Sequence, residues 1–127
     1  MAHILIIDDD PAVLSLFGQF MESSGYSVAL AADGREGLRL MKQQTPDLII
    51  TDIMMPEMDG LEIIHEIAKT HPLLPVIAIS GGMRNVSVNF LVHAKKFGAR
   101  RILVKPVTLA DLLQTVEELL KESAQKI

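Results

Sequence analysis

The sequence predicts a doubly wound α/β domain built on a parallel β-sheet, and two features indicate this class. Five short apolar runs, rich in β-branched residues, alternate with longer segments of helical period. The runs are apolar throughout, as expected of strands that helices cover on both faces. Five successive βα units are typical of this class. Because 127 residues suffice for one buried core, we expect a single domain over residues 1–127.

The predicted strands are each four residues long. They are Ile4–Ile7, Ser27–Leu30, Leu48–Thr51, Val76–Ile79 and Arg101–Val104. Four of the five helices expected between and after these strands begin at a clear capping residue. These caps are Asp10 (followed by Pro11), Asp33 and Asp59 (each with Glu three residues later) and Thr108 (with Asp111).

The last two predicted helices differ in how clearly the sequence marks them. In the final helix the apolar residues recur at helical spacing and predict a buried stripe of Leu109, Leu112, Leu113, Val116, Leu119 and Leu120. In the fourth helix, residues 86–97 fit a helical face but also alternate as a strand would. We predict a helix there that is less rigid than its neighbours, because β-branched residues lower helix propensity.

Composition excludes several functional classes. The net charge of -4 argues against general electrostatic binding to nucleic acid, and the absence of Trp argues against a base-stacking platform. No apolar run approaches the ~18 residues that span a membrane, and the N-terminus lacks the pattern of a secretory signal. With no cysteine, disulfides and thiolate metal sites are excluded, which is compatible with a cytoplasmic location.

Polar residues follow the predicted strands at one edge of the sheet. Asp8 and Asp9 follow the first strand, and Asp52 follows the third. Ser80 follows the fourth strand and Lys105 follows the fifth. In an open parallel sheet, the carboxyl ends of the strands form the edge at which ligands bind. We therefore expect three carboxylates, a hydroxyl and an ammonium to lie in one pocket.

Three carboxylates in one pocket require a cation or raised pKa values, since two such charges ~4 Å apart repel by roughly 4 kcal/mol at an effective dielectric constant of about 20. All-oxygen ligation suits Mg²⁺, with Mn²⁺ and Ca²⁺ as alternatives. An aspartate can also act as a nucleophile and form an acyl phosphate. Lys105 would neutralise one phosphoryl oxygen, and Ser80 could donate a hydrogen bond to another.

Other residues with chemical potential have simpler interpretations. Asp10 is predicted to be a helix cap, and the cluster of Met54, Met55 and Met58 is predicted to pack in a loop, because thioethers bind hard cations poorly. The four histidines have no metal-ligand spacing, and we interpret them as surface or helix-packing residues; they are His3, His65, His71 and His93.

Taken together, the motifs resemble the receiver domain of bacterial two-component response regulators. The matching segments are Ile-Leu-Ile-Ile-Asp-Asp-Asp-Pro at 4–11, Pro-Asp-Leu-Ile-Ile-Thr-Asp-Ile-Met-Met-Pro-Glu-Met-Asp-Gly at 46–60, Ser80, and Gly-Ala-Arg-Arg-Ile-Leu-Val-Lys-Pro at 98–106. The resemblance covers essentially the whole chain, and the middle segment is the most specific. It implies a flavodoxin-like sheet of strand order 2-1-3-4-5 with five helices.

The resemblance also implies a metal site. Asp9 would bind Mg²⁺ directly and Asp8 mostly through water. Asp52 and the backbone carbonyl of Met54 would complete the protein ligands. The same comparison makes the peptide bond between Lys105 and Pro106 cis, an isomer that X-Pro bonds reach at modest cost.

The phosphoryl group would be held by a second set of contacts that the resemblance implies. Asp52 would accept it from a histidine kinase or a histidine phosphotransfer protein. Lys105 would pair with it, and Ser80 would donate a hydrogen bond to it. The backbone amides of Met54 and Gly81 would help to hold its oxygens. The chain would thus be a signalling switch that catalyses only its own phosphorylation and dephosphorylation.

On phosphorylation, we expect Ser80 and the following glycine loop to move inward. This movement would change the face made by the fourth helix, the fifth strand and the fifth helix, and that face would control an output partner. The domain would act as a monomer or as a phosphorylation-dependent homodimer, without direct contact to nucleic acid or membrane. The family often has an aromatic residue where this chain has Ile102.

Three other functions were weighed against the switch. A phosphatase of the haloacid dehalogenase type would need an acid two residues after Asp52, and Met54 is there. A flavin-binding module would place phosphate beside Asp8 and Asp9, which would repel it. An unphosphorylated receiver-like scaffold for protein-protein interaction is the remaining alternative, although every expected site position is filled.

Overall fold

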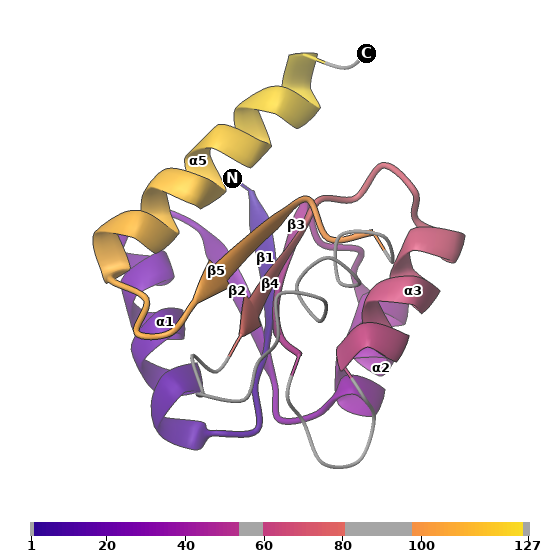
Figure 1. Cartoon of the computed structure of the whole chain (residues 1–127), viewed down its shortest axis with the longest axis horizontal. Helices are drawn as coiled ribbons and strands as arrows, with labels where there is room; N and C mark the ends of the chain where they lie inside the picture. The colour runs from indigo at the N-terminus through magenta and orange to yellow at the C-terminus, as the bar shows by residue number, and fades with distance from the viewer. Residues whose placement is uncertain (1, 54–59, 81–97, 126–127) are drawn as a thin grey trace.

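The computed structural model describes residues 2–53, 60–80 and 98–125 and confirms the predicted fold class (Figure 1). Its five strands are all parallel and lie in the order β2-β1-β3-β4-β5. Their bounds are β1 His3–Ile7, β2 Ser27–Ala31, β3 Leu48–Asp52, β4 Val76–Ser80 and β5 Arg101–Val104. The strand order reverses between β1 and β3, the position at which open α/β sheets bind ligands.

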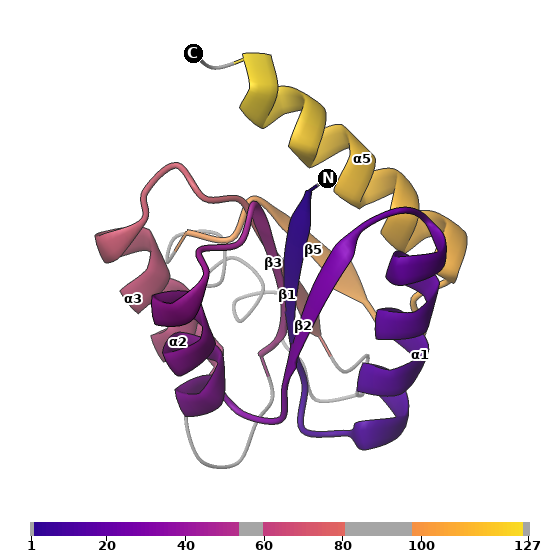
Figure 2. The ribbon, with the colours of Figure 1, turned by 180° about the vertical axis from the view of Figure 1, so that it is seen from behind.

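Helices cover both faces of the sheet. On one face lie α1 (Pro11–Ser23) and α5 (Leu109–Gln125), and on the other lie α2 (Gly34–Gln43) and α3 (Gly60–Thr70), as the two opposite views show (Figures 1 and 2). The fourth predicted helix falls on residues outside the described part of the chain. Within the described ranges, no helix is both long enough and apolar enough to cross a membrane.

Side chains along the central strands alternate between two buried layers. On β1, Ile4 and Ile6 pack with α1 and α5, whereas Leu5 and Ile7 pack with α2 and α3. Both sets are at most 1% exposed, so strands buried in this way carry apolar residues on both faces. This explains why they read as continuous apolar runs in the sequence.

Local sequence signals set the helix starts as predicted. The Asp10 carboxylate accepts from Ala12 N at 2.9 Å, and the Asp33 carboxylate accepts from Glu36 N at 2.8 Å. The Thr108 hydroxyl accepts from Asp111 N at 3.1 Å. The cap predicted at residue 59 lies outside the described residues. In α5 the predicted stripe faces the sheet, with its most buried members at Leu112, Val116 and Leu119.

Four strands are one residue longer than predicted, and long-range pairing explains the difference. β1 begins at His3, whose N–H donates to an Asp47 carboxylate oxygen at 2.7 Å. β3 includes Asp52, which pairs with Ile79, and β4 includes Ser80, which pairs with Val104. Two predicted site residues are therefore strand residues, held by the rigid sheet and not by a loop.

Candidate functional site

Three carboxylates meet at the carboxyl edge of the central strands. Asp8 and Asp9 follow β1, and Asp52 is the last residue of β3. One ligand oxygen from each lies within 4.8 Å of the others. Asp8 is 2% exposed and Asp52 is 5% exposed, whereas Asp9 faces solvent. The structure thus brings together the acidic residues that the sequence singled out, with two of them buried.

Backbone contacts fix the orientation of Asp8. Its N–H donates to the Ala31 carbonyl at 3.1 Å, which continues the pairing of β1 with β2 by one residue. Its Oδ1 accepts from Asp10 N at 2.9 Å. With Oδ1 engaged by the start of α1, the second oxygen, Oδ2, is directed toward Lys105.

Lys105 brings a positive charge to the acidic residues from the end of β5. Its Nζ lies 3.3 Å from Asp52 Oδ2 and 3.7 Å from Asp8 Oδ2. Its backbone N–H donates to the Ser80 carbonyl at 2.8 Å, and the peptide bond to Pro106 is cis, as expected. One ammonium therefore contacts the two buried carboxylates at the same time.

Burial and charge pairing act in opposite directions on the pKa values of Asp8 and Lys105. Burial is the largest influence on Asp8 and raises its pKa, with a further increase from the neighbouring Asp52 charge. The Asp10 amide and Lys105 oppose this increase without overcoming it. For Lys105, burial disfavours the charged form, but Asp52 and Asp8 outweigh burial and raise its pKa. A further cation in this pocket would reduce the repulsion between the carboxylates, whose charge Lys105 neutralises only in part.

Ser80 ends β4, the strand beside Asp52, and is 0% exposed. Its Oγ has no hydrogen-bond partner within the described residues. An unpaired buried hydroxyl costs about 1–3 kcal/mol relative to a paired one. This hydroxyl is therefore available to a ligand that brings an acceptor oxygen to the strand edge.

Thr51 contacts the backbone of Asp52, and the sequence pattern did not identify it as part of the site. It is 0% exposed, and its hydroxyl donates to the carbonyl oxygen of the next residue, Asp52, at 3.1 Å. A polar residue inside an otherwise apolar strand was the available signal. The apolar pattern of this strand by itself predicts only packing.

The remaining predicted residues do not all take the positions that the sequence suggested. Met54 and Gly81, expected as backbone ligands, lie outside the described residues, as does His93. His65 is exposed, as predicted, but His3 is a strand residue that is only 8% exposed. The His3 Nδ1 contacts the Ser27 hydroxyl at 2.9 Å, so this histidine supports the start of the sheet.

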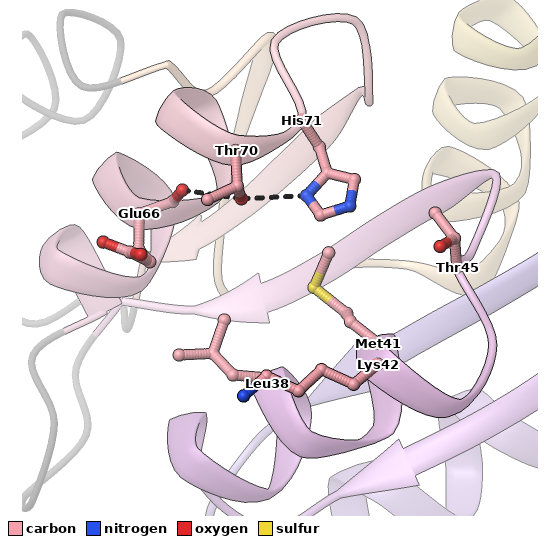
Figure 3. Close-up of a pocket in the computed structure, with 7 residues that line it drawn as sticks. All are labelled: Leu38, Met41, Lys42, Thr45, Glu66, Thr70 and His71. Carbon is pink, nitrogen blue, oxygen red and sulfur yellow. Dashed lines mark hydrogen bonds between the residues drawn. The ribbon is translucent and has the colours of Figure 1, made fainter.

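A separate cavity of about 400 Å³ lies between the C-terminal parts of α2 and α3 (Figure 3). Helices of parallel βα units run back across the sheet, so their ends lie at the edge opposite the carboxylates. Its lining is Leu38, Met41, Lys42, Thr45, Glu66, Thr70 and His71. Because none of the predicted site residues lines it, the cavity is distinct from the acidic site.

A parallel sheet of this strand order, with an acidic cluster and a lysine at its carboxyl edge, defines the class of receiver-type signalling domains. The chain belongs to the response regulator receiver domain family, whose sequence model matches residues 4–117. It is therefore a receiver domain of two-component response regulators.

Individual relatives agree with this assignment. The transcriptional regulatory protein GlrR of Escherichia coli (strain K12) is 41% identical over 123 residues, which make up 97% of this chain and 27% of that protein. The response regulator MprA of Mycolicibacterium vanbaalenii is 38% identical over 121 residues, 95% of this chain and 51% of that protein. The chain thus spans about a quarter to a half of these relatives.

Solved structures agree as well. The CheY-like receiver domain protein from Methanospirillum hungatei JF-1 superposes with a TM-score of 0.93 at 33% identity. The match covers 100% of this chain and 99% of that one.

Proposed function

We propose that this domain is a phosphorylation-dependent switch in which Asp52 accepts a phosphoryl group from a histidine kinase or a histidine phosphotransfer protein. The observation that carries the proposal is the position of Lys105, whose Nζ lies 3.3 Å from Asp52 Oδ2 and 3.7 Å from Asp8 Oδ2. A buried carboxylate with a cation beside it can act as a nucleophile while charge that develops on the phosphoryl oxygens is neutralised.

In the proposed reaction, an Asp52 carboxylate oxygen attacks phosphorus and forms the new P–O bond. The P–N bond of the donor phosphohistidine breaks, and its electron pair leaves with the imidazole. Phosphoryl transfer depends mainly on positioning and charge neutralisation. Sheet pairing of Asp52 with Ile79 supplies the positioning, and Lys105 supplies the charge.

Asp8, Asp9 and Asp52 would hold one Mg²⁺, with Mn²⁺ as an alternative. The donor set fits, because three carboxylates within 4.8 Å of one another offer the hard oxygen ligands that this cation prefers. When bound, Mg²⁺ would screen the negative charges of the carboxylates and of the incoming phosphoryl group. Asp9 is expected to bind directly and Asp8 mostly through water, with the Met54 carbonyl as a further ligand.

The response to phosphorylation would begin at Ser80. Its buried hydroxyl has no partner in the described part of the chain, so an acceptor oxygen on Asp52 would give it one. Ser80 is tied to β5 through its carbonyl, which accepts from Lys105 N. A shift of Ser80 and Gly81 toward the phosphoryl group would therefore change the face that β5 and α5 share with the fourth predicted helix.

Partners and output would lie outside this domain. Since the curated relatives are two to four times longer, we propose that the output belongs to a further domain or to a separate protein. The domain itself would have no direct contact with nucleic acid and would act in the cytoplasm. It would work as a monomer or pair with a second copy on phosphorylation.

The test is intact-mass analysis after treatment with acetyl phosphate, with and without Mg²⁺. Wild type is expected to gain the mass of one phosphoryl group only with Mg²⁺, and Asp52→Asn is expected to gain none. Asp33→Asn is the matched control, since it changes an aspartate that caps α2 and is not one of the three clustered carboxylates. If wild type stays unmodified by acetyl phosphate and by phosphorylated histidine donors, the alternative of an unphosphorylated scaffold is favoured.

A further inference from the structure

Thr51 places a buried hydroxyl next to the candidate phosphoacceptor. Its side chain is 0% exposed within β3, and its Oγ1 lies 3.1 Å from the carbonyl oxygen of Asp52. The hydroxyl is the donor, because a carbonyl oxygen can only accept. A hydrogen bond removes the free-energy cost of leaving a buried hydroxyl unpaired, so this contact explains how a polar side chain is accommodated in an apolar strand.

The carbonyl of Asp52 lies where β3 leaves its ladder with β1. Pairing of β1 with β3 ends at Ile7 and Thr51, whereas β3 remains bound to β4 through Ile53 N and Ile79 O at 3.1 Å. In a planar trans peptide the C=O and the N–H point in opposite directions. The peptide between Asp52 and Ile53 is therefore held by β4 through its N–H and by the Thr51 hydroxyl through its carbonyl.

We propose that Thr51 is a positioning residue for the acidic site, an inference that rests on the proposed function. By binding the Asp52 carbonyl, Thr51 fixes the orientation of the peptide that follows Asp52. That orientation determines how the Asp52 carboxylate faces Asp8 and Lys105.

Two substitutions separate the effect of the Thr51 hydrogen bond from the effect of side-chain packing. Thr51→Val keeps the branched shape and removes the donor. Thr51→Ser keeps the donor and removes a buried methyl group, so it is expected to lower the melting temperature. Each variant is compared with wild type for thermal unfolding, for the Mg²⁺ dissociation constant by calorimetric titration, and for the rate of labelling by acetyl phosphate.

We expect Thr51→Val to weaken Mg²⁺ binding and to slow labelling, each by roughly three- to tenfold, as the loss of one hydrogen bond implies. Thr51→Ser is expected to stay within about twofold of wild type in both, even though it loses a buried methyl group. Activity that follows the hydroxyl and not the melting temperature supports a positioning role.

Two results would overturn this role. One is a Thr51→Val domain that binds Mg²⁺ and accepts phosphate as wild type does. The other is a loss of activity in both variants that follows their loss of stability. Failure of the proposed function has a different signature, because wild type itself would then remain unlabelled, and the Mg²⁺ titrations of the three proteins would decide the role of Thr51.

Discussion

Replacing Asp8 by asparagine is expected to stabilise the domain when no metal is bound, although the change removes a predicted metal ligand. Asp8 is 2% exposed, so its charged form has lost most of its contact with water. An asparagine has nearly the same shape and keeps an oxygen that can accept from Asp10 N. The substitution therefore removes a charge while retaining the local hydrogen bond.

The magnitude follows from two opposing Coulomb energies. At an effective dielectric constant of about 20, Asp52 within 4.8 Å repels Asp8 by at least about 3.5 kcal/mol, and Lys105 at 3.7 Å attracts it by about 4.5 kcal/mol. Solvent screens part of the attraction, because the Lys105 side chain is 29% exposed. The two energies nearly cancel. The cost of burying the Asp8 charge then decides whether the substitution raises or lowers the free energy of unfolding.

Because burial raises the pKa of Asp8, the folded state binds its proton more tightly than the unfolded state does. Wild type therefore loses stability as the pH rises from the ordinary aspartate pKa of 3.8 through the raised pKa of Asp8. Asp8→Asn does not lose this stability, because an asparagine side chain does not ionise. Its advantage at pH 7 is expected to be on the order of 1 kcal/mol, or about 3–5 °C in melting temperature, and it should vanish at acidic pH.

The assay is thermal unfolding followed by circular dichroism in EDTA, at pH 7 and near pH 3.5. Asp9→Asn is the matched control, since Asp9 adjoins Asp8 but is exposed, and its metal-free stability should change by less than about 0.5 kcal/mol. Added Mg²⁺ at ten times its dissociation constant should stabilise wild type by about 1.4 kcal/mol and both variants less. An Asp8→Asn domain less stable than wild type in EDTA at pH 7 would refute the reasoning.

Three further predictions test other parts of the structure. Lys105→Gln should destabilise the metal-free domain by about 1–3 kcal/mol in urea unfolding, because Asp8 and Asp52 lose their shared cation; unchanged stability would contradict that pairing. Gly98→Ala should lower the free energy of unfolding by about 2–4 kcal/mol, since φ is +130° and the new Cβ would lie 2.7 Å from the Ala68 Cβ. Gly25→Ala, where φ is also positive but the surrounding space is open, should lower it by only about 1 kcal/mol. Equal losses in the two variants would exclude the clash with Ala68. Asp33→Ala should lower the melting temperature through the loss of about 1 kcal/mol of capping, whereas Asp33→Ser should retain most of it.

The sequence by itself determined the layered fold and the position of the site. Continuous apolar runs placed each strand to within one residue, because strands buried on both faces leave that pattern directly in the chain. Capping residues such as Asp10 and Asp33 act on amides two or three positions away, so their effect is local and can be predicted. Polar residues at the strand ends marked the edge of the sheet, since parallel strands all finish on the same side.

Contacts between distant strands decided what the sequence left open. Asp8 and Asp9 are chemically alike and adjacent, yet only Asp8 is buried, because the way β1 enters the turn before α1 directs one carboxylate inward and the other to solvent. The roles of Thr51 and His3 depend on partners that pattern analysis does not consider. The Thr51 hydroxyl binds the Asp52 carbonyl, and the His3 ring contacts Ser27 on the neighbouring strand. The position of Lys105 between two carboxylates likewise depends on the pairing of β5 with β4, since Lys105 and Asp52 are 53 positions apart in the chain. Distances of this kind are set by the assembled sheet, and the order of residues along the chain does not specify them.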